Sequence, residues 1–218
     1  MTAAGGLAQA AIDVLAISPV IPVVVVQDAR QAVPLARALA RGGVGVIEIT
    51  LRTEAGLSAV ERVAAEVPEV RVGAGTVTTP SEVEAVRRAG ASFIVLPGSP
   101  ERLLSAALDA GLPLLPGAGT MTEMMRLAEA GLEVLKFFPA GPSGGADYLS
   151  AVAGPLPRLR FCPTGGITQA SASSYLALAN VPCVGGSWLT PADAVAAGDW
   201  ARIESLAAEA AALRPGPA

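Results

Sequence analysis

The chain has 218 residues, of which 52% are hydrophobic and 4% aromatic, and it carries a formal net charge of −4 without any histidine. The lack of histidine excludes a Ser-His-Asp triad, a Cys-His pair and the usual histidine-bearing zinc and iron sites. A Mg²⁺ site made of carboxylates stays open, but no acidic cluster indicates one, and we expect no metal. No basic stripe, long apolar run or cationic leader is present, so we expect no nucleic-acid partner, no membrane and a cytoplasmic location.

Short apolar runs alternate along the chain with amphipathic, alanine-rich stretches. The apolar runs predict strands over residues 20–26, 44–51, 70–74, 92–96, 113–115, 134–138, 160–163 and 183–185. The other stretches predict helices over residues 7–16, 31–41, 55–67, 80–89, 100–110, 121–130, 147–153, 171–179 and 200–213. We therefore expect residues 7–213 to be structured and residues 214–218 to form a flexible tail.

Capping residues support these helix limits. Residues 79–82 (TPSE) and 120–123 (TMTE) each place a glutamate three positions after a threonine cap. Eight strands that alternate with helices at short spacing predict one α/β domain over residues 1–218, a (β/α)₈ TIM barrel with an extra N-terminal helix. An open doubly wound sheet is the alternative, but no Gly-x-Gly-x-x-Gly follows the first predicted strand.

The two cysteines, Cys162 and Cys183, each lie in a strand-like segment and show no metal-type spacing. We interpret them as small buried hydrophobic residues of a reducing compartment.

Lys136 is the only lysine of the chain, and every other basic side chain is an arginine. It lies within the apolar run 134–139. A buried lysine amine can lose its proton and attack a carbonyl group, whereas an arginine guanidinium cannot. The sequence therefore indicates one nucleophilic amine at Lys136. The alternative is a lysine whose stem packs on apolar surface while its amine reaches water.

Polar residues alternate within and just after the predicted strand 44–51. Val46, Glu48, Thr50 and Arg52 share one face, because successive side chains of a strand point to opposite sides. Apolar helices cover the outside of a barrel, so we expect this face to point inward. This makes Glu48 and Arg52 candidate functional residues. The alternative is that they form a purely structural ion pair.

Glycine-rich segments follow several predicted strands, at the end of a barrel where active sites lie. The pairs Gly165-Gly166 and Gly185-Gly186 follow the last two strands, the position at which barrels most often bind phosphate. Consecutive glycines expose backbone N–H groups to an anion, although they also occur in ordinary turns. With Thr164 and Ser187 beside them, these pairs predict a phosphate site.

Five segments at the ends of predicted strands carry a family pattern. They are residues 47–53 (IEITLRT), 72–76 (VGAGT), 136–140 (KFFPA), 160–167 (RFCPTGGI) and 185–189 (GGSWL). In this order they resemble the family of 2-keto-3-deoxy-6-phosphogluconate (KDPG) and 4-hydroxy-2-oxoglutarate (KHG) aldolases, over about residues 12–213. The resemblance implies a class I aldolase on a TIM barrel, a homotrimer without metal or cofactor.

The resemblance also implies a role for particular residues. Lys136 corresponds to the Schiff-base lysine and Glu48 to the carboxylate that transfers protons. The residues around the pyruvate part of the substrate correspond to Arg52, Thr76, Pro97 and Phe138. The residues of the phosphate pocket correspond to Thr164, Gly165, Gly166, Gly186 and Ser187. The loop 116–120 varies more among members, which leaves its role in specificity open.

The implied substrates are small molecules, a keto-acid phosphate and pyruvate. KDPG would be cleaved to pyruvate and glyceraldehyde 3-phosphate, or KHG to pyruvate and glyoxylate, through an iminium ion on Lys136, with Glu48 moving protons directly or through a water. Two alternatives stay open. One is a metal-free sugar-phosphate isomerase or decarboxylase without a covalent step, and the other is a non-catalytic phosphosugar-binding barrel.

Overall fold

The computed structural model describes residues 3–213, which form short parallel strands and surrounding helices. The strands are β1 (Val20–Val24), β2 (Val46–Thr50), β3 (Arg71–Gly75), β4 (Ile94–Val95), β5 (Leu114–Leu115), β6 (Gly117–Ala118), β7 (Val134–Phe137), β8 (Arg160–Pro163) and β9 (Val184–Gly186). The helices are α1 (Ala3–Ala16), α2 (Ala32–Arg41), α3 (Ala55–Glu66), α4 (Pro80–Arg88), α5 (Glu101–Asp109), α6 (Met121–Glu129), α7 (Gly145–Val152), α8 (Gln169–Leu176), α9 (Ala192–Ala197) and α10 (Trp200–Ala211), with a 3₁₀ turn at Ala29–Gln31.

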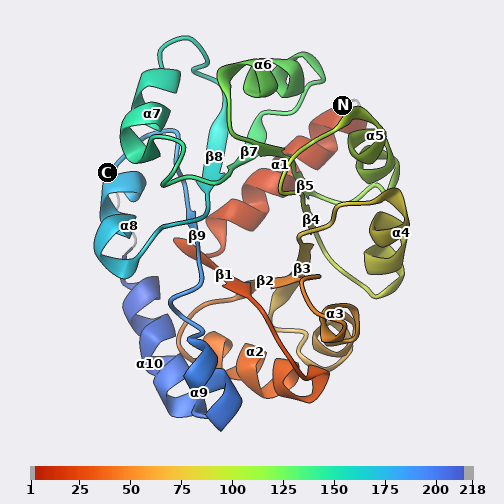
Figure 1. The fold of residues 1–218 in the computed structure, drawn as a ribbon, viewed down its shortest axis with the longest axis vertical. Helices are drawn as coiled ribbons and strands as arrows, with labels where there is room; N and C mark the ends of the chain where they lie inside the picture. The colour runs from red at the N-terminus through yellow and green to blue at the C-terminus, as the bar shows by residue number, and fades with distance from the viewer. Residues whose placement is uncertain (1–2, 214–218) are drawn as a thin grey trace.

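The strands pair in two parallel groups, in the orders β5-β4-β3-β2-β1-β9 and β6-β7-β8. Two links connect the groups. β5 and β6 are separated by Pro116 alone, and Thr164, directly after β8, forms a parallel bridge with Gly185 of β9. Figure 1 shows the strands curling around a centre, with most helices outside them. The structure confirms an α/β fold built on a curled parallel sheet.

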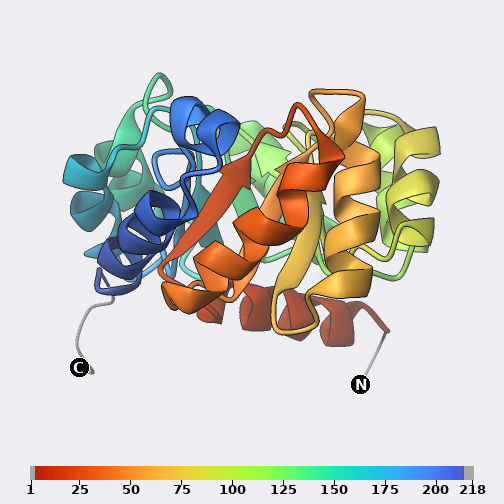
Figure 2. The same ribbon diagram turned by 90° about the horizontal axis from the view of Figure 1, so that it is seen from below.

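Apolar side chains fill both sides of the curled sheet. A large cluster packs between the strands and the outer helices. A smaller cluster lies inside the curl and consists of Ala11, Val14, Leu15, Ile21, Val46, Phe93, Val95, Leu115, Val134, Cys162 and Cys183. Figure 2 shows α1 lying across the end of the sheet from which the strands start. Apolar packing thus fills the interior near α1, which leaves the carboxyl ends of the strands for polar side chains.

The structure corrects several predicted limits. α1 begins at Ala3 and includes Gly5 and Gly6, so the described structure starts before residue 7. Glycine has a low helix propensity, which tertiary context overrides here. The predicted strand 113–115 stops before Pro116, which cannot donate a hydrogen bond to a strand ladder. In the structure a second short strand, β6, follows this proline and was not predicted. α9 was also not predicted. The predicted tail at 214–218 lies outside the described residues.

Both cysteines are free and buried, as predicted. Burial raises the pKa of the Cys183 thiol well above its usual value, and a hydrogen bond with Cys162 acts in the same direction. The Cys183 thiol therefore stays protonated and packs as a small apolar group.

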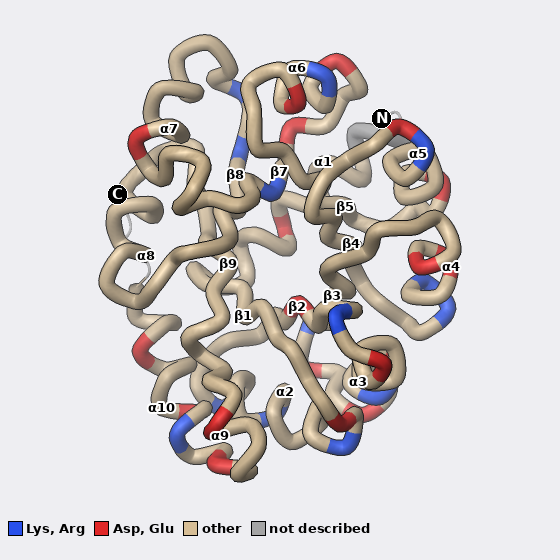
Figure 3. The backbone as a smooth tube through the Cα atoms, viewed as in Figure 1, with Lys and Arg blue, Asp and Glu red and all other residues tan. Residues whose placement is uncertain are grey.

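Charged side chains lie mostly on the outer helices. In Figure 3 the positions of basic residues (blue) and acidic residues (red) intermix along the outer helices. Surface ion pairs such as Arg41–Glu204 and Arg202–Asp193 account for part of this pattern. No helix within residues 3–213 has both the length and the apolar composition needed to cross a membrane.

Candidate active site

A lysine and a glutamate meet inside the curled sheet. Lys136 lies on β7 and Glu48 on β2, and each side chain is only 3% exposed. The Nζ of Lys136 donates a hydrogen bond to Oε1 of Glu48 at 3.1 Å. The interpretation of Lys136 as a lysine whose amine reaches water is therefore wrong. The proposed structural pair between Glu48 and Arg52 is wrong as well, because Glu48 pairs with Lys136.

The local strand geometry explains why the Lys136 amine points inward. Val134 belongs to the interior cluster, and Lys136 lies two residues later on the same face of β7. The backbone N–H of Lys136 donates to the carbonyl of Pro116 at 2.9 Å, and Lys136 is in register with Gly117 and Cys162. A strand held on both sides thus carries the amine, which keeps its position well defined.

Two further predicted residues, Arg52 and Thr76, lie together after neighbouring strands. Nε of the exposed Arg52 donates to Oγ1 of Thr76 at 3.2 Å. Thr76 has a φ of 57° and is the only non-glycine residue with positive φ in the described part of the chain. For a β-branched residue this conformation is strained, and such strain clusters at functional sites. The structure therefore joins these two residues at the ends of β2 and β3.

Phe138 connects the lysine to the glycine pair after β8. Its ring centroid lies 5.3 Å from Nζ of Lys136. Gly165 packs against the same ring, so closely that a Cβ atom at position 165 would lie 3.2 Å from Cε2 of Phe138. Gly165 and Gly166 have φ angles of 99° and 77°, a conformation that favours glycine. Pro97 is half-buried at the end of the strand segment that contains β4.

The remaining predicted phosphate residues lie around the bridge between β8 and β9. Thr164 is buried, and its partner in the bridge is Gly185. Gly186 is buried as the last residue of β9, whereas Ser187, directly after it, is exposed. Within the described residues, the backbone N–H groups of Gly165 and Gly166 have no intramolecular acceptor. These donors are therefore available to a bound anion.

The loop 116–120 is fixed by a capping box of α6. Oε2 of Glu123 accepts hydrogen bonds from the backbone N–H groups of Gly119 at 2.8 Å and Thr120 at 2.9 Å. The hydrogen bond from Gly119 lowers the pKa of the Glu123 carboxyl group, against the opposing effect of burial. The sequence identified this capping box but not its contact with Gly119. That contact ties the loop to the start of the helix.

We expect Glu123→Ala to lower the free energy of unfolding by about 1 kcal/mol at neutral pH, because the backbone N–H groups of Gly119 and Thr120 lose the carboxylate that accepts their hydrogen bonds. The folded-state pKa of Glu123 is lowered, so the carboxylate stabilises the fold above its unfolded pKa of 4.5 and loses this effect as pH falls through the folded pKa. Urea unfolding at neutral pH and at about pH 3 measures the difference from the unsubstituted chain, which should shrink in acid.

Glu129→Ala, on the same helix, is the matched control, since Glu129 is exposed at the other end of α6. It should change stability by less than about 0.5 kcal/mol. A destabilisation by Glu123→Ala that is equally large at both pH values would contradict the role of the charged carboxyl group.

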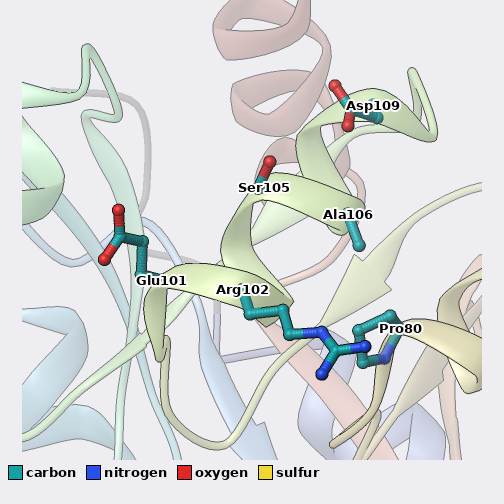
Figure 4. Close-up of a pocket in the computed structure, with 6 residues that line it drawn as sticks. All are labelled: Pro80, Glu101, Arg102, Ser105, Ala106 and Asp109. Carbon is teal, nitrogen blue, oxygen red and sulfur yellow. The ribbon is translucent and has the colours of Figure 1, made fainter.

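An open surface pocket lies elsewhere, on the outer helices (Figure 4). It is lined by Pro80 at the start of α4 and by residues of α5, namely Glu101, Arg102, Ser105, Ala106 and Asp109. None of the predicted site residues lines it. The buried Lys136–Glu48 contact, rather than this pocket, therefore identifies the candidate site. Residues 3–213 contain no group of three or more Cys, Asp or Glu side chains placed to hold a metal ion.

A buried amine in contact with a carboxylate supplies the two groups that a lysine-dependent enzyme needs to react with carbonyl compounds, a nucleophile and a proton carrier. Residues 11–206 match the family described as KDPG and KHG aldolase. The chain belongs to this family.

Several relatives and solved structures are similar to this protein over more than nine tenths of its chain. The KHG/KDPG aldolase of Escherichia coli (strain K12) is 52% identical over 198 residues, which cover 91% of this chain and 93% of that protein. A KDPG aldolase structure from Legionella pneumophila, which holds pyruvate as a covalent carbinolamine intermediate, has a TM-score of 0.89 at 42% identity and covers 91% and 96% of the two chains. The enzyme of Zymomonas mobilis ZM4 with 3-phosphoglycerate has a TM-score of 0.90 at 40% identity, with coverages of 96% and 98%.

Proposed function

We propose that the protein is a class I aldolase that reversibly cleaves KDPG to pyruvate and glyceraldehyde 3-phosphate, and that it also accepts KHG. The observation that carries this proposal is the 3.1 Å contact between buried Lys136 and Glu48. Family membership supports it, as does the name of the Escherichia coli relative, which includes both substrates.

The first step forms a carbon–nitrogen bond. The neutral amine of Lys136 adds to the C2 ketone of the substrate, and loss of water gives an iminium ion that draws electrons from the neighbouring carbons. Glu48, within hydrogen-bond distance of the amine, is placed to exchange protons during this addition. The carbinolamine captured in the Legionella pneumophila structure is an intermediate of this kind.

The second step breaks the C3–C4 bond. Its electron pair moves toward the iminium nitrogen and leaves an enamine, while Glu48 takes the proton of the C4 hydroxyl group directly or through a water. Glyceraldehyde 3-phosphate leaves. Glu48 then returns a proton to C3, and water releases pyruvate from Lys136. One carboxylate can serve both proton transfers because it accepts a proton from the C4 hydroxyl group and afterwards donates one to C3.

Two groups of residues bind the ends of the substrate. Arg52, held by Thr76, would bind the carboxylate of the pyruvate part, for which the guanidinium fork is suited. Pro97 and Phe138 would pack against its carbons. The phosphate would bind the N–H groups of the glycine pairs together with two hydroxyl side chains, at Thr164, Gly165, Gly166, Gly186 and Ser187. The absence of intramolecular acceptors for Gly165 and Gly166 among the described residues supports this placement.

We also propose the larger arrangement implied by the family. The strands close into a (β/α)₈ TIM barrel, with β5 and β6 as one interrupted strand, and residues 1–218 form a single domain. The links at Pro116 and between Thr164 and Gly185 support closure. The protein would act as a homotrimer in the cytoplasm, on small-molecule substrates and without metal or cofactor.

The test is a cleavage assay in which released pyruvate is measured from KDPG, its galactonate epimer and KHG side by side. We expect pyruvate from KDPG, with a smaller rate from KHG. Binding of KDPG without pyruvate release, or product formation without carbon–carbon cleavage, would contradict the proposal. It would instead support a phosphosugar-binding barrel or an isomerase.

A further inference from the structure

Gly75, the last residue of β3, lies directly beneath the side chain of Glu48. A Cβ atom at position 75 would lie 2.5 Å from both Cγ and Cδ of Glu48 and would be closer still to its Oε1. Real Cβ atoms essentially never approach another heavy atom below 3.0 Å. The Glu48 carboxyl group therefore occupies space that any other residue at position 75 would fill.

The pairing of β2 and β3 explains this contact. Glu48 is in register with Gly73, and Thr50 with Gly75. The Glu48 side chain leans along the strand, past its own partner, and reaches the level of Gly75. Gly75 is not one of the glycines with positive φ, so its backbone does not itself demand a glycine. What demands a glycine there is the side chain of Glu48.

We propose that Gly75 is a positioning residue, which holds the Glu48 carboxyl group within reach of Lys136 by leaving its volume free. This inference rests on the proposed function, in which Glu48 transfers protons. Gly73 lies on the same face of β3 as Gly75 but contacts a different side chain. A Cβ atom at position 73 would overlap the ring of Phe93 in the interior cluster. Gly73 thus serves core packing, and Gly75 serves the site.

A substitution at Gly75 should therefore affect two partial reactions differently, namely adduct formation at Lys136 and proton exchange at the pyruvate methyl group. A methyl group at position 75 pushes the carboxyl group away, while Lys136 stays on β7 and keeps its amine. Pyruvate should then still form an adduct with Lys136, but proton exchange at the pyruvate methyl group, which needs a placed base, should slow. Displacing a reacting group by about 1 Å can cost about 100-fold in rate.

The experiment compares the full chain with its Gly75→Ala variant. Borohydride trapping of pyruvate followed by mass spectrometry measures the adduct, and the loss of the methyl signal in deuterated water measures exchange. We expect Gly75→Ala to keep the trapped adduct and to lose exchange by about 100-fold or more. Gly45→Ala is the matched control, since a Cβ atom there would make an ordinary 3.4 Å contact with Ile17, and it should leave both reactions unchanged. Exchange in Gly75→Ala within about threefold of the unsubstituted rate would overturn the inference.

A double variant tests the same point through stability. Glu48→Ala removes the atoms that a residue at 75 would overlap, so Gly75→Ala should lower the melting temperature in the unsubstituted chain but not in the Glu48→Ala chain. If Gly75→Ala alone fails to fold, the double variant should still fold and melt close to the Glu48→Ala chain. Equal destabilisation in both chains, or failure of the double variant to fold when Glu48→Ala does fold, would overturn the inference.

The stability cycle does not depend on catalysis. Absence of a trapped adduct in the unsubstituted chain would therefore overturn the proposed function, whereas the cycle would still decide whether Gly75 accommodates Glu48.

Discussion

A Lys136→Met variant is expected to form no borohydride-trapped pyruvate adduct and to lose KDPG cleavage by more than about 10⁴-fold. Methionine keeps the unbranched apolar stem but cannot add to a ketone, so the covalent pathway is closed. Intact-mass spectrometry after trapping measures the adduct, and release of pyruvate measures cleavage. Because Lys136 is the only lysine of the chain, no other lysine side chain can take its place.

Two controls separate the reactive amine from positive charge. Lys136→Arg keeps a cation at the site and should be as inactive as Lys136→Met. Arg158→Lys adds a second lysine on the surface, where the Arg158 side chain is 79% exposed, and it should neither form an adduct there nor change cleavage. Cleavage by Lys136→Arg at the unsubstituted rate would show that no covalent step occurs, as in the isomerase or decarboxylase alternative.

Glu48→Gln is expected to lower KDPG cleavage by about 10² to 10⁴-fold, the usual contribution of a general acid or base. The amide keeps the size of the carboxyl group and can still accept a hydrogen bond from Lys136, but it cannot carry a proton. Adduct formation should therefore fall less than cleavage or methyl exchange. Single-turnover measurements of the three reactions on one preparation give the comparison.

Glu61→Gln is the matched control for this substitution, because Glu61 is exposed on α3, the helix that follows β2. Its cleavage rate should stay within about twofold of the unsubstituted rate. If Glu48→Gln lowered adduct formation, exchange and cleavage by the same factor, Glu48 would act on binding or on the amine alone, and the proton transfers would need another group.

Much of the fold follows from short-range patterns. The alternation of apolar runs and amphipathic stretches predicts the parallel α/β sheet, and the capping boxes at Thr79 and Thr120 form as predicted. The observed limits of helices and strands differ from the predicted ones where packing outweighs local propensity. α1 extends through two glycines, and Pro116 divides a strand segment whose second part pairs with β7 rather than β4.

Part of the candidate site also follows from short-range patterns in the sequence. Lys136 stands out because it is the only lysine of the chain. The period-two alternation of β2 indicates which of its side chains share the inward face, since the two faces of a strand are set locally. The role of Gly75 was missed. Two glycines spaced two residues apart, in and just after the predicted strand 70–74, are a possible signal, but the spacing alone does not distinguish Gly75 from Gly73, which packs against Phe93.

Residue type and strand alternation are local properties, so the reactive groups and the strand faces that carry them follow from the amino-acid sequence alone. The pairing of Glu48 with Lys136, 88 residues away, instead of with the nearby Arg52 arises from the folded arrangement of the strands. That choice depends on how far the sheet curls and which strands face each other across it. The same curvature and strand register place Gly75 beneath the carboxyl group, a contact that no local pattern contains.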